Sequence, residues 1–379
     1  MSDGPILRVD GEPYVGWELL RVNKSLDQIC GTFQAQISDR LTEGGDEAVE
    51  RWPIKRNAPC TIETPSGEVL LTAYAETISP AYNGRQHSIM ISGRGVTCDL
   101  VDCSYIDEKR EWIDETVKAI VEKICEPFDI VVGVEANAIT QATDASKKLS
   151  RFEYNEGETA GATIQRACGL RALRAIDLGD GKITLLHSGD EQADDVLRSG
   201  INIKSARGTG SDRDRFGLYI VKANALDTDA TEEGDEEDYI EPEGRFVDSS
   251  IFADEPHNAD KRFRPFVIQS NGVSTNEECE AQAKWMAAQR AGDSREWQIL
   301  TGGWEQSNGK LWPLNRKTLV VDPFMGLDGD LMLISSLGFE FGRQGSQTKI
   351  GISFPEKYKL LDTGDNLVKV VDQFDGGEE

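Results

Sequence analysis

Trp52-Pro53-Ile54-Lys55-Arg56 is matched 260 positions later by Trp312-Pro313-Leu314-Asn315-Arg316, and this repeated Trp-Pro-x-x-Arg pattern decides the predicted fold. Carried forward at the same offset, the long β-rich run Val69–Ser79 falls on Gly329–Phe339. Few residues are identical, but a short strand, a turn, a long strand, a Gly-containing turn and a closing strand follow in the same order. Because turn positions fix strand pairing and register, the shared order predicts two similar β structures.

The first copy lies in residues 1–94, where every β-rich run is bounded by turn residues. Asn83-Gly84 between two such runs is a strong hairpin signal, because both turn positions require positive φ. Short strands with hairpin connections predict a small barrel. The expected strands are Ile6–Val9, Tyr14–Arg21, Ile29–Ile37, Cys60–Glu63, Val69–Ser79 and Gln86–Ser92. In the second copy they are Ile201–Lys204, Phe216–Ala223, Trp297–Gly302, Thr318–Val321, Leu331–Phe341 and Gln347–Phe354.

Between the two copies the pattern changes to helical spacing. Apolar residues recur at this spacing from Trp112 to Phe128, and a second helix is expected from about Thr159 to Cys168. The polar residues 135–150 are expected to be a loop, and Gly179-Asp180-Gly181 predicts a hairpin turn. These elements predict a compact α+β unit.

The predicted fold is therefore mainly β with an α+β insertion: two similar small β-barrels bracket an α+β domain, and the second barrel is discontinuous. A helix begins near the capping-box residues Ser274–Glu277 and ends near Gly292, inside the interruption. The predicted domains are the first β-barrel (1–104), the α+β domain (105–190), the second β-barrel (191–226 and 296–355), an acidic loop and helical insertion (227–295), and an acidic C-terminal tail (356–379).

The charge balance argues against a nucleic-acid-binding protein. Lys and Arg number 41 against 67 Asp and Glu, giving a formal net charge of −26. Nucleic-acid binders neutralise phosphates with basic groups, whereas an acidic surface repels DNA and would suit a conduit that DNA crosses. No apolar run approaches the roughly 18 residues of a membrane helix, and the N-terminus has no signal-peptide pattern. We expect a soluble chain made in a cytoplasm, with no membrane partner.

No residue pattern predicts catalysis, a cofactor or a metal site. Three histidines and no CxxC pair give no zinc motif. There is no Gly-x-Ser-x-Gly elbow, and a nucleophilic role for Cys103 has no supporting context. Gly93-Arg94-Gly95 and Gly208-Thr209-Gly210 resemble fragments of phosphate loops but lack their lysine, so both are interpreted as turns. The seven cysteines are expected to be reduced thiols: Cys30, Cys60, Cys98, Cys103, Cys125, Cys168 and Cys279.

Three charged segments have more than one interpretation. Ten carboxylates and no basic residue lie between Asp227 and Glu243, which predicts an exposed loop; calcium binding is the alternative, although no Asp-x-Asp-x-Asp-Gly pattern supports it. Two basic clusters are interspersed with aspartates and are expected to form surface ion pairs, with subunit or pore contacts as the alternative. Their members are Arg207, Arg213 and Arg215, and Lys261, Arg262 and Arg264.

The stretch from Ser92 to Ser104, with Gly-Arg-x-x-x-x-Asp-Leu-Val-Asp-Cys-Ser, resembles the junction motif of baseplate central hub proteins of Mu-like contractile-tailed phages, the tail hub or late control protein D family. In that family the motif closes the first barrel and opens the next domain. Further fragments resemble the family in the same order, across most of residues 1–355. They are Glu156-Gly157-Glu158-Thr159, Arg262-Phe263-Arg264-Pro265, Gly302-Gly303-Trp304 and Gly309-Lys310-Leu311-Trp312-Pro313-Leu314-Asn315.

The resemblance implies a structural hub rather than an enzyme. It implies a homotrimer whose two barrels per chain alternate around a pseudo-sixfold ring, in the baseplate of a virion tail. Its partners would be the tail tube protein, the tail spike protein and other baseplate proteins, with DNA passing through without specific binding. No catalytic, cofactor-binding or metal residue follows, and the interface residues stay undefined. The alternatives are the hub portion of a related contractile injection machine (a pyocin or secretion spike) and a cell-wall hydrolase.

Overall fold

The computed structural model describes residues 4–39, 54–83, 86–106, 111–189, 191–223, 242–249, 252–253, 256, 261–270 and 275–359. The chain divides into two compact units. Unit 1 comprises Met1–Cys168, Leu173–Gly208 and Trp297–Ser353, and unit 2 comprises Gly169–Ala172, Thr209–Glu296 and Phe354–Glu379.

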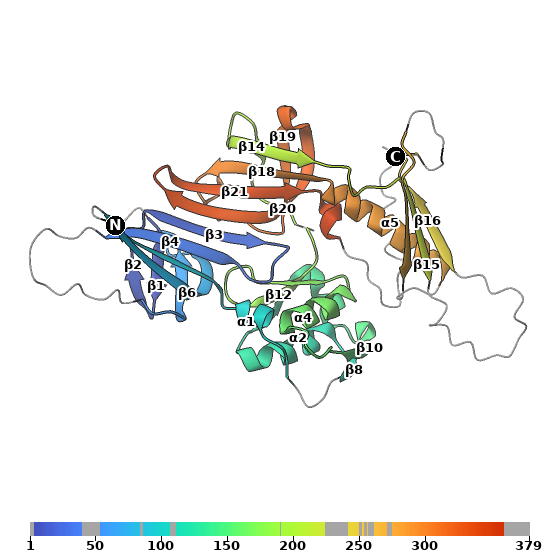
Figure 1. Cartoon of the computed structure of the whole chain (residues 1–379), viewed down its shortest axis with the longest axis horizontal. Helices are drawn as coiled ribbons and strands as arrows, with labels where there is room; N and C mark the ends of the chain where they lie inside the picture. Colours follow the sequence, from blue (N-terminus) through green and yellow to red (C-terminus); the bar gives the residue numbers. More distant parts are fainter. Residues whose placement is uncertain are drawn as a thin grey trace, which may run out of the picture. The chain divides into compact units, whose positions relative to one another are not determined.

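A sheet of 13 strands, seen in Figure 1, dominates unit 1, so the predicted mainly-β class is confirmed. Its main path runs β14-β18-β21-β20-β3-β4-β7-β6-β5-β1-β2, and β19 joins β20 and β13 beside this path. The strands from the first part of the chain are β1 (Ile6–Val9), β2 (Glu12–Tyr14), β3 (Leu19–Ser25), β4 (Thr32–Asp39), β5 (Ala58–Glu63), β6 (Val69–Asn83) and β7 (Gln86–Gly95). Those from the last part are β13 (Leu197–Arg198), β14 (Ile203–Gly210), β18 (Arg295–Gly302), β19 (Lys317–Asp322), β20 (Leu327–Gly342) and β21 (Gly345–Ser353).

The two parts of this sheet share one strand order. The first β region reads β3-β4-β7-β6-β5-β1, and the second reads β14-β18-β21-β20-β19-β13. In both regions the six strands also follow one another along the chain in the same sequence. One pairing differs, because β1 is antiparallel to β5 whereas β13 is parallel to β19. The repeated strand order therefore extends beyond the three strands that sequence comparison aligned.

Local irregularities repeat as well. Asn57 precedes β5 with φ 63°, and Asn315 precedes β19 with φ 61°. The Asn57 amide donates to the Ala75 carbonyl at 2.8 Å, and the Asn315 amide donates to the Ile334 carbonyl at 3.0 Å. The register of the following long-strand pair shifts after Tyr74 in the first region and after Ile334 in the second. Asparagine tolerates left-handed backbone better than most residues, and bulges are built features of a sheet.

The two regions are joined edge to edge within the chain. Strand β3 pairs antiparallel with the second half of β20, from Ser25 opposite Ser336 to Leu20 opposite Phe341. The ion pair Arg21–Glu340 crosses this joint at 3.2 Å. The sheet is thus continuous across the first and second β regions, and the closure of each region into a barrel stays a prediction.

The α+β domain packs against the sheet within unit 1 (Figure 1). Strands β9, β11 and β12 form one sheet and β8 and β10 another. Its elements are α1 (Cys98–Asp102), β8 (Glu111–Glu115), α2 (Val117–Cys125), η1 (Glu126–Phe128), β9 (Val132–Val134), η2 (Ala136–Ala138), α3 (Ile139–Thr143), η3 (Ala145–Lys147), β10 (Leu149–Glu153), α4 (Ala160–Gly169), β11 (Arg174–Ile176) and β12 (Ile183–Leu186).

Two predictions in this domain are wrong. Trp112 lies in β8, where its ring packs against Tyr105, Phe152 and Tyr154, and the helix begins only after Thr116, whose side chain accepts from the Ala119 amide. Residues 135–150 contain helical turns rather than a loop without secondary structure. The helix was predicted to begin too early because β8 is only five residues long, and a strand that short cannot be told from a helix by the spacing of its apolar residues.

Unit 2 is a three-stranded sheet on one helix. Strands β15 (Leu218–Ala223), β16 (Glu243–Val247) and β17 (Pro265–Ser270) pack against α5 (Asn276–Asp293), and η6 (Pro355–Tyr358) lies beside α5. The buried core consists of Tyr219, Val221, Cys279, Ala283 and Ala287. Strand β15 pairs with β16 and β17 here, so it differs from our assignment of Phe216–Ala223 to the second barrel. The insertion therefore begins before residue 227.

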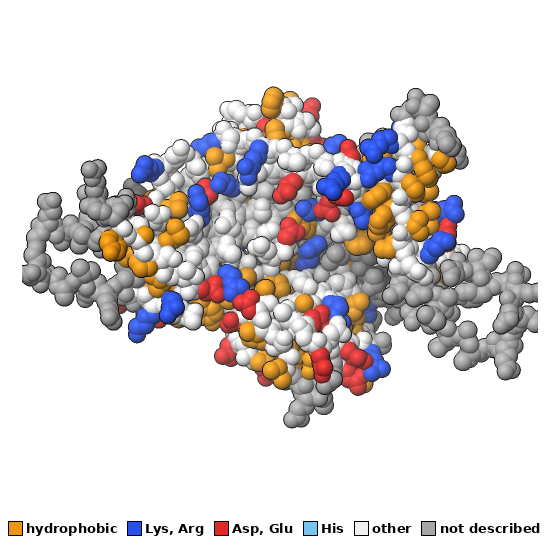
Figure 2. Space-filling model, in the orientation of Figure 1, with side chains coloured by type: hydrophobic (Ala, Val, Ile, Leu, Met, Phe, Trp, Pro, Cys, Tyr) orange, Lys and Arg blue, Asp and Glu red, His pale blue; other side chains and the backbone are white. Residues whose placement is uncertain are grey.

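The face of the molecule in view in Figure 2 carries no single charge sign. Figure 2 shows Lys and Arg side chains interspersed with Asp and Glu on the face in view. The helices that the structure describes include none that is both long enough and apolar enough to cross a membrane.

Several predictions fall outside the described residues. They concern Trp52 and Pro53 of the repeat, Gly84 of the Asn-Gly turn, most of the acidic tract Asp227–Glu243, Ser274 of the capping box, and the tail beyond residue 359.

Candidate functional site

The junction motif holds the sheet and the α+β domain together, and close backbone contact requires a glycine at its position 93. Gly93 lies in β7, opposite the bulge of β6, and a Cβ atom there would be 1.8 Å from the Tyr74 carbonyl oxygen. The interpretation of Gly93-Arg94-Gly95 as a turn is wrong. Gly208, interpreted in the same way, lies in β14 with its missing Cβ 2.5 Å from Trp297, so it too serves packing within a sheet.

Arg94 connects β6 with α1. Its guanidinium makes paired contacts with both oxygens of Glu76 (2.9 and 2.7 Å) and of Asp102 (3.0 and 2.6 Å). These two carboxylates raise the pKa of Arg94 further above its usual value, and Arg94 lowers the pKa of Asp102. Two-pronged contacts to a carboxylate fix geometry as well as charge, so Arg94 orients α1 on the sheet.

The buried carboxylate of Asp177, in the α+β domain, is hydrogen-bonded to the junction motif. Asp177 accepts hydrogen bonds from the Thr97 hydroxyl (3.0 Å) and from the amides of Gly179 (2.7 Å) and Gly181 (3.2 Å). Burial raises the pKa of Asp177, while the three donors act in the opposite direction. Gly179 has φ +115°, and a Cβ there would be 2.4 Å from the Leu70 carbonyl. The β11–β12 turn thus lies directly on β6.

Lys24 enters the same junction from β3. It is 9% exposed, and its Nζ donates to the Leu178 carbonyl at 2.8 Å. Burial lowers the pKa of Lys24 to about 8, despite the nearby Asp177. Strand β3 is also the strand that pairs with β20, so the junction and the joint between β regions share one element.

The second Trp-Pro motif forms a similar attachment for the second β region. Asn315 is fully buried, its Oδ1 accepts from the Gly189 amide (2.9 Å) and its Nδ2 donates to the His187 carbonyl (2.8 Å). Arg316 contacts Glu135 (3.3 Å) and Glu191 (3.0 Å). The motif therefore anchors the chain where it leaves the α+β domain.

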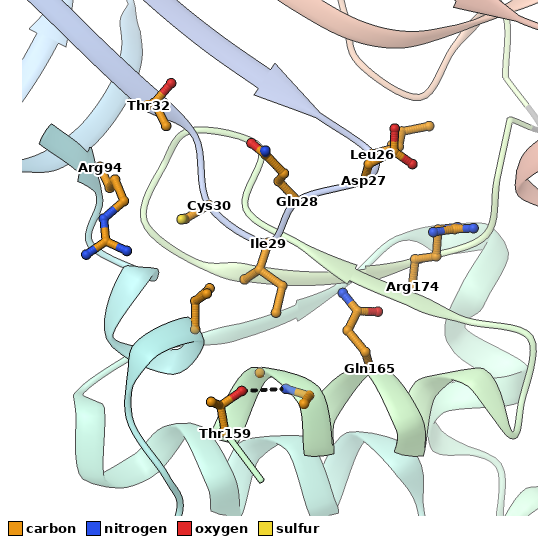
Figure 3. A pocket seen from close by; sticks show the side chains of 13 residues that line it. Leu26, Asp27, Gln28, Ile29, Cys30, Thr32, Arg94, Thr159, Gln165 and Arg174 are labelled. Atoms are coloured by element: carbon orange, nitrogen blue, oxygen red, sulfur yellow. Dashed lines mark hydrogen bonds between the residues drawn. The ribbon is translucent and has the colours of Figure 1, made fainter.

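A pocket of about 630 Å³ opens beside the junction, between the β3–β4 loop and α4. Figure 3 shows Ile29 pointing from the loop toward α4, with Arg94 on one side and Arg174 on the other. Gln165 donates to the Ala175 carbonyl at 2.7 Å, and the Thr159 hydroxyl accepts from the Ala162 amide at 3.2 Å. The Thr159, Gln165 and Arg94 side chains in its lining are thus engaged in contacts within the fold.

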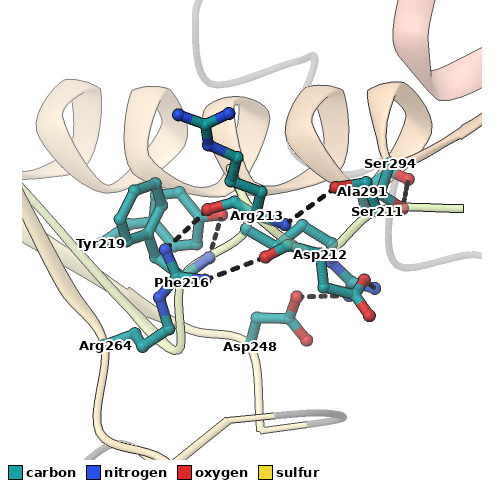
Figure 4. Close-up of polar contacts among 10 residues, drawn as sticks. Ser211, Asp212, Arg213, Phe216, Tyr219, Asp248, Arg264, Ala291 and Ser294 are labelled. Carbon is teal, nitrogen blue, oxygen red and sulfur yellow. Dashed lines mark hydrogen bonds and ion pairs between the residues drawn. The ribbon is translucent and has the colours of Figure 1, made fainter.

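Members of the two predicted basic clusters meet in unit 2, where Figure 4 shows Arg264 beside Arg213. Arg215 is buried and contacts Asp248 at 2.7 Å and Asp212 at 3.4 Å. Arg264 donates to the main-chain carbonyls of Asp212 (2.9 Å) and Arg213 (2.6 Å). Its guanidinium also lies 4.9 Å from the ring centre of Phe216, which is cation–π geometry. These contacts fix the segment before β15. Arg215 pairs with aspartates as predicted, but it is buried rather than on the surface.

The thiols and acidic groups form no metal centre in the described part of the chain, where no set of three or more His, Cys, Asp or Glu could hold an ion. None of the seven cysteines, all of which lie in the described residues, forms a disulfide, and only Cys103 is exposed. Burial raises the pKa of Cys60, Cys98 and Cys125 to about 12, so these thiols are unreactive at neutral pH.

Sequence reasoning missed the exposed apolar residues of the second β region. Phe324 in η5 (Pro323–Met325) is 94% exposed, and Leu319 and Leu331, which are cross-strand neighbours, are also exposed. The alternation in β19 could have indicated this, since Leu319 points away from the buried Thr318 and Val320. Leu319 and Leu331 therefore form a small exposed apolar pair on these two strands.

Three family models match consecutive parts of the chain. They are the baseplate hub protein gp44-like second domain (residues 97–187), the N-terminal domain of Mu phage baseplate assembly protein GpP-like proteins (6–95) and the fourth domain of Mu phage baseplate assembly protein GpP (275–361). The first boundary falls at the junction motif.

Whole-chain comparisons give the same picture. The chain is 23% identical to baseplate hub protein gp44 of Escherichia phage Mu over 357 residues, covering 93% of this chain and 88% of gp44. The 43 kDa tail protein of prophage MuSo2 from Shewanella oneidensis is 27% identical, with a TM-score of 0.79, covering 94% of this chain and 99% of that one. The tail protein from Neisseria meningitidis MC58 shares the fold at 17% identity and a TM-score of 0.72, covering 94% and 98%.

Proposed function

Because the chain belongs to the family of baseplate hub proteins of Mu-like contractile-tailed phages, we propose that it forms a trimeric ring that adapts a sixfold tail tube to a threefold spike. The observation that carries this proposal is the repeated strand order of the two β regions. Three chains with two similar regions each offer six similar positions, while the ring itself keeps threefold symmetry.

The junction supports the same mechanism. The two β regions can occupy equivalent positions in a ring only if each is held at a fixed angle to the rest of unit 1. Arg94, Asp177 and Asn315 attach the two regions to one α+β domain through buried or paired polar contacts. Such contacts are directional and fix orientation. The α+β domain therefore acts as a brace for both regions.

We further propose that DNA passes through the ring without specific binding, and that the tail spike, the tail tube and other baseplate proteins are its partners in the virion. The formal charge of −26 supports a conduit that does not retain DNA. The chain's relatives are structural baseplate proteins, and a non-enzymatic role is proposed here as well. A peptidoglycan zymogram that shows lysis would contradict this role.

Of the predicted domains, 1–104 and 105–190 are retained as a proposal, except that α1 (Cys98–Asp102) is assigned to the α+β domain. The second β region is proposed to begin at residue 191 and to resume at 296, and the insertion to begin near Thr209, where unit 2 begins. The helical part of this insertion is proposed to lie outside the ring.

The test is reconstitution. The purified chain is mixed with the tube and spike proteins encoded beside it, and complexes are imaged by electron cryomicroscopy without imposed symmetry. We expect a threefold ring with six similar β lobes between tube and spike. The proposal would be contradicted if each complex contained a single copy of the chain, or if the chain bound neither the tube protein nor the spike protein.

A further inference from the structure

Within one chain, a pair of strands joins the two β regions. The internal repeat predicts a second, equivalent strand pair, and the two strands that would form it are not paired with each other in the same chain. The joint pairs β3 with the second half of β20. Under the repeated strand order, β3 corresponds to β14, and β20 corresponds to β6. The equivalent second joint would therefore pair β14 with the second half of β6.

Strand β6 has an open edge in the required place. It pairs with β5 only from Val69 to Ala75, while its pairing with β7 continues to the hairpin. Across Thr77–Ala81, no other strand in the described part of the chain lies on the side opposite β7. Strand β20 is built alike: Leu327–Leu333 pairs with β19, and Ser336–Phe341 pairs with β3. In β20 the equivalent half is covered.

Strand β14 offers the matching edge. It ends the main path of the sheet, where it pairs with β18 alone among the named strands described. Six of its eight residues are exposed, and the other two, Ile203 and Ala206, are half-buried. A strand edge presents main-chain amides and carbonyls that another strand can pair with.

We propose that β14 of one chain pairs antiparallel with Thr77–Ala81 of β6 in a neighbouring copy, which repeats the β3–β20 joint between subunits. This inference rests on the proposed ring, and it identifies the strands that close it. Thr77–Ala81 contains no charged residue, so Lys204 and Arg207 of β14 meet no like charge there. Pro80 has no amide hydrogen, so it contributes no donor to the proposed joint.

If the same strand pairing forms within each chain and between neighbouring chains, the three chains close into a ring. Each chain then has one internal joint and contributes one strand to each of two intersubunit joints, so six joints of one kind alternate around three chains. A head-to-tail contact of this kind closes when the rotation per subunit divides the circle. The contact is heterologous, so a pairwise complex leaves one β14 and one β6 edge open.

The test is disulfide trapping in a Cys103→Ser background, since Cys103 is the exposed native thiol. Ala81→Cys is combined with Ser205→Cys or with Arg207→Cys. Arg21→Cys with Glu340→Cys, which are directly opposite across the internal joint, serves as the matched control. We expect at least one β14–β6 pair to give linked dimers and trimers on denaturing gels, while the control pair stays at the monomer mass.

Hydrogen exchange gives an independent measurement on the unmodified chain. On assembly, the amides of β14 and of Thr77–Ala81 that point toward the joint should exchange about tenfold or more slowly, because they gain carbonyl partners across it. If light scattering shows a trimer but neither cross-links nor protection appear, the strand pairing is overturned and the ring proposal stands. If no species above the monomer mass forms, alone or with tube and spike proteins, both proposals fail.

Discussion

Gly93 shows how much one missing side chain contributes at the residue scale. The sequence indicates a special backbone site at Gly93-Arg94-Gly95, but it cannot tell a turn from a close approach between strands, since both require glycine. The bulge after Tyr74 that creates the contact depends on pairing between distant segments. The partner Glu76 of Arg94 could not be predicted for the same reason.

Replacing Gly93 with alanine should destabilise the first β region by about 3 kcal/mol, because the new Cβ would overlap the Tyr74 carbonyl. Gly133→Ala is the control, since the nearest atom to its Cβ would be 3.9 Å away. The comparison is made by urea unfolding monitored with hydrogen exchange in β6 and β7. Equal stability of the two variants would show that the sheet accommodates the methyl group.

The buried Lys24 gives a pH dependence whose sign can be stated. Its pKa is about 8 in the folded chain against 10.5 for the unperturbed group, so between these values the unfolded chain binds more protons. Stability should therefore rise from pH 8 to pH 10.5 by up to about 3 kcal/mol, and lose this increment as pH falls toward 8. In Lys24→Met this part of the slope should vanish. Parallel pH profiles for both proteins would contradict the assignment.

At the scale of elements, composition and turn signals predict most strands of the sheet but fail where a short strand precedes a helix. Trp112 continues the helical spacing of the following residues, yet its ring belongs to an aromatic cluster in β8. The assignment of β15 failed for a different reason. Nothing in a single strand says which sheet it will join, and β17, its parallel partner, follows only after a long insertion.

Within unit 2, the two carboxylates on Arg215 should differ strongly in importance. Asp248 is largely buried beside the guanidinium, whereas Asp212 is about half exposed. Asp248→Ala leaves a buried charge without its close partner and should cost about 3–5 kcal/mol. Asp212→Ala should cost less than about 1 kcal/mol.

Local stability is read from hydrogen exchange of β15 and β17, because unfolding of a chain with two units is not a single transition. Similar effects of the two substitutions would mean that Arg215 is stabilised by neighbours other than Asp248.

At the scale of the whole molecule, the internal repeat was visible in sequence because the turns and a tetrad of residues kept their spacing. The sequence did not reveal the left-handed backbone at Asn57 and Asn315 or the joint between β3 and β20. Both features depend on how strands meet in space. The exposed Phe324 was also missed, because exposure of a single apolar residue follows from the packing around it.

The chain should bind no duplex DNA at physiological salt. Binding through six or more phosphates would fall steeply as salt is added, and the mixed surface in Figure 2 offers no continuous basic face on the side in view. Fluorescence anisotropy with a labelled duplex, measured at low and physiological salt, checks this. A salt-sensitive complex that persists at physiological salt would reveal a basic surface and would replace the passive conduit with a DNA-holding channel.

The central claim is that two similar β regions per chain build a threefold ring, and the molar mass in solution tests it most directly. Light scattering coupled to size exclusion is run on the full chain, alone and with the tube and spike proteins. We expect a particle with three times the chain mass of 41.8 kDa, either for the chain alone or for the chain in complex with those partners. A stable species of single-chain mass under both conditions would contradict it.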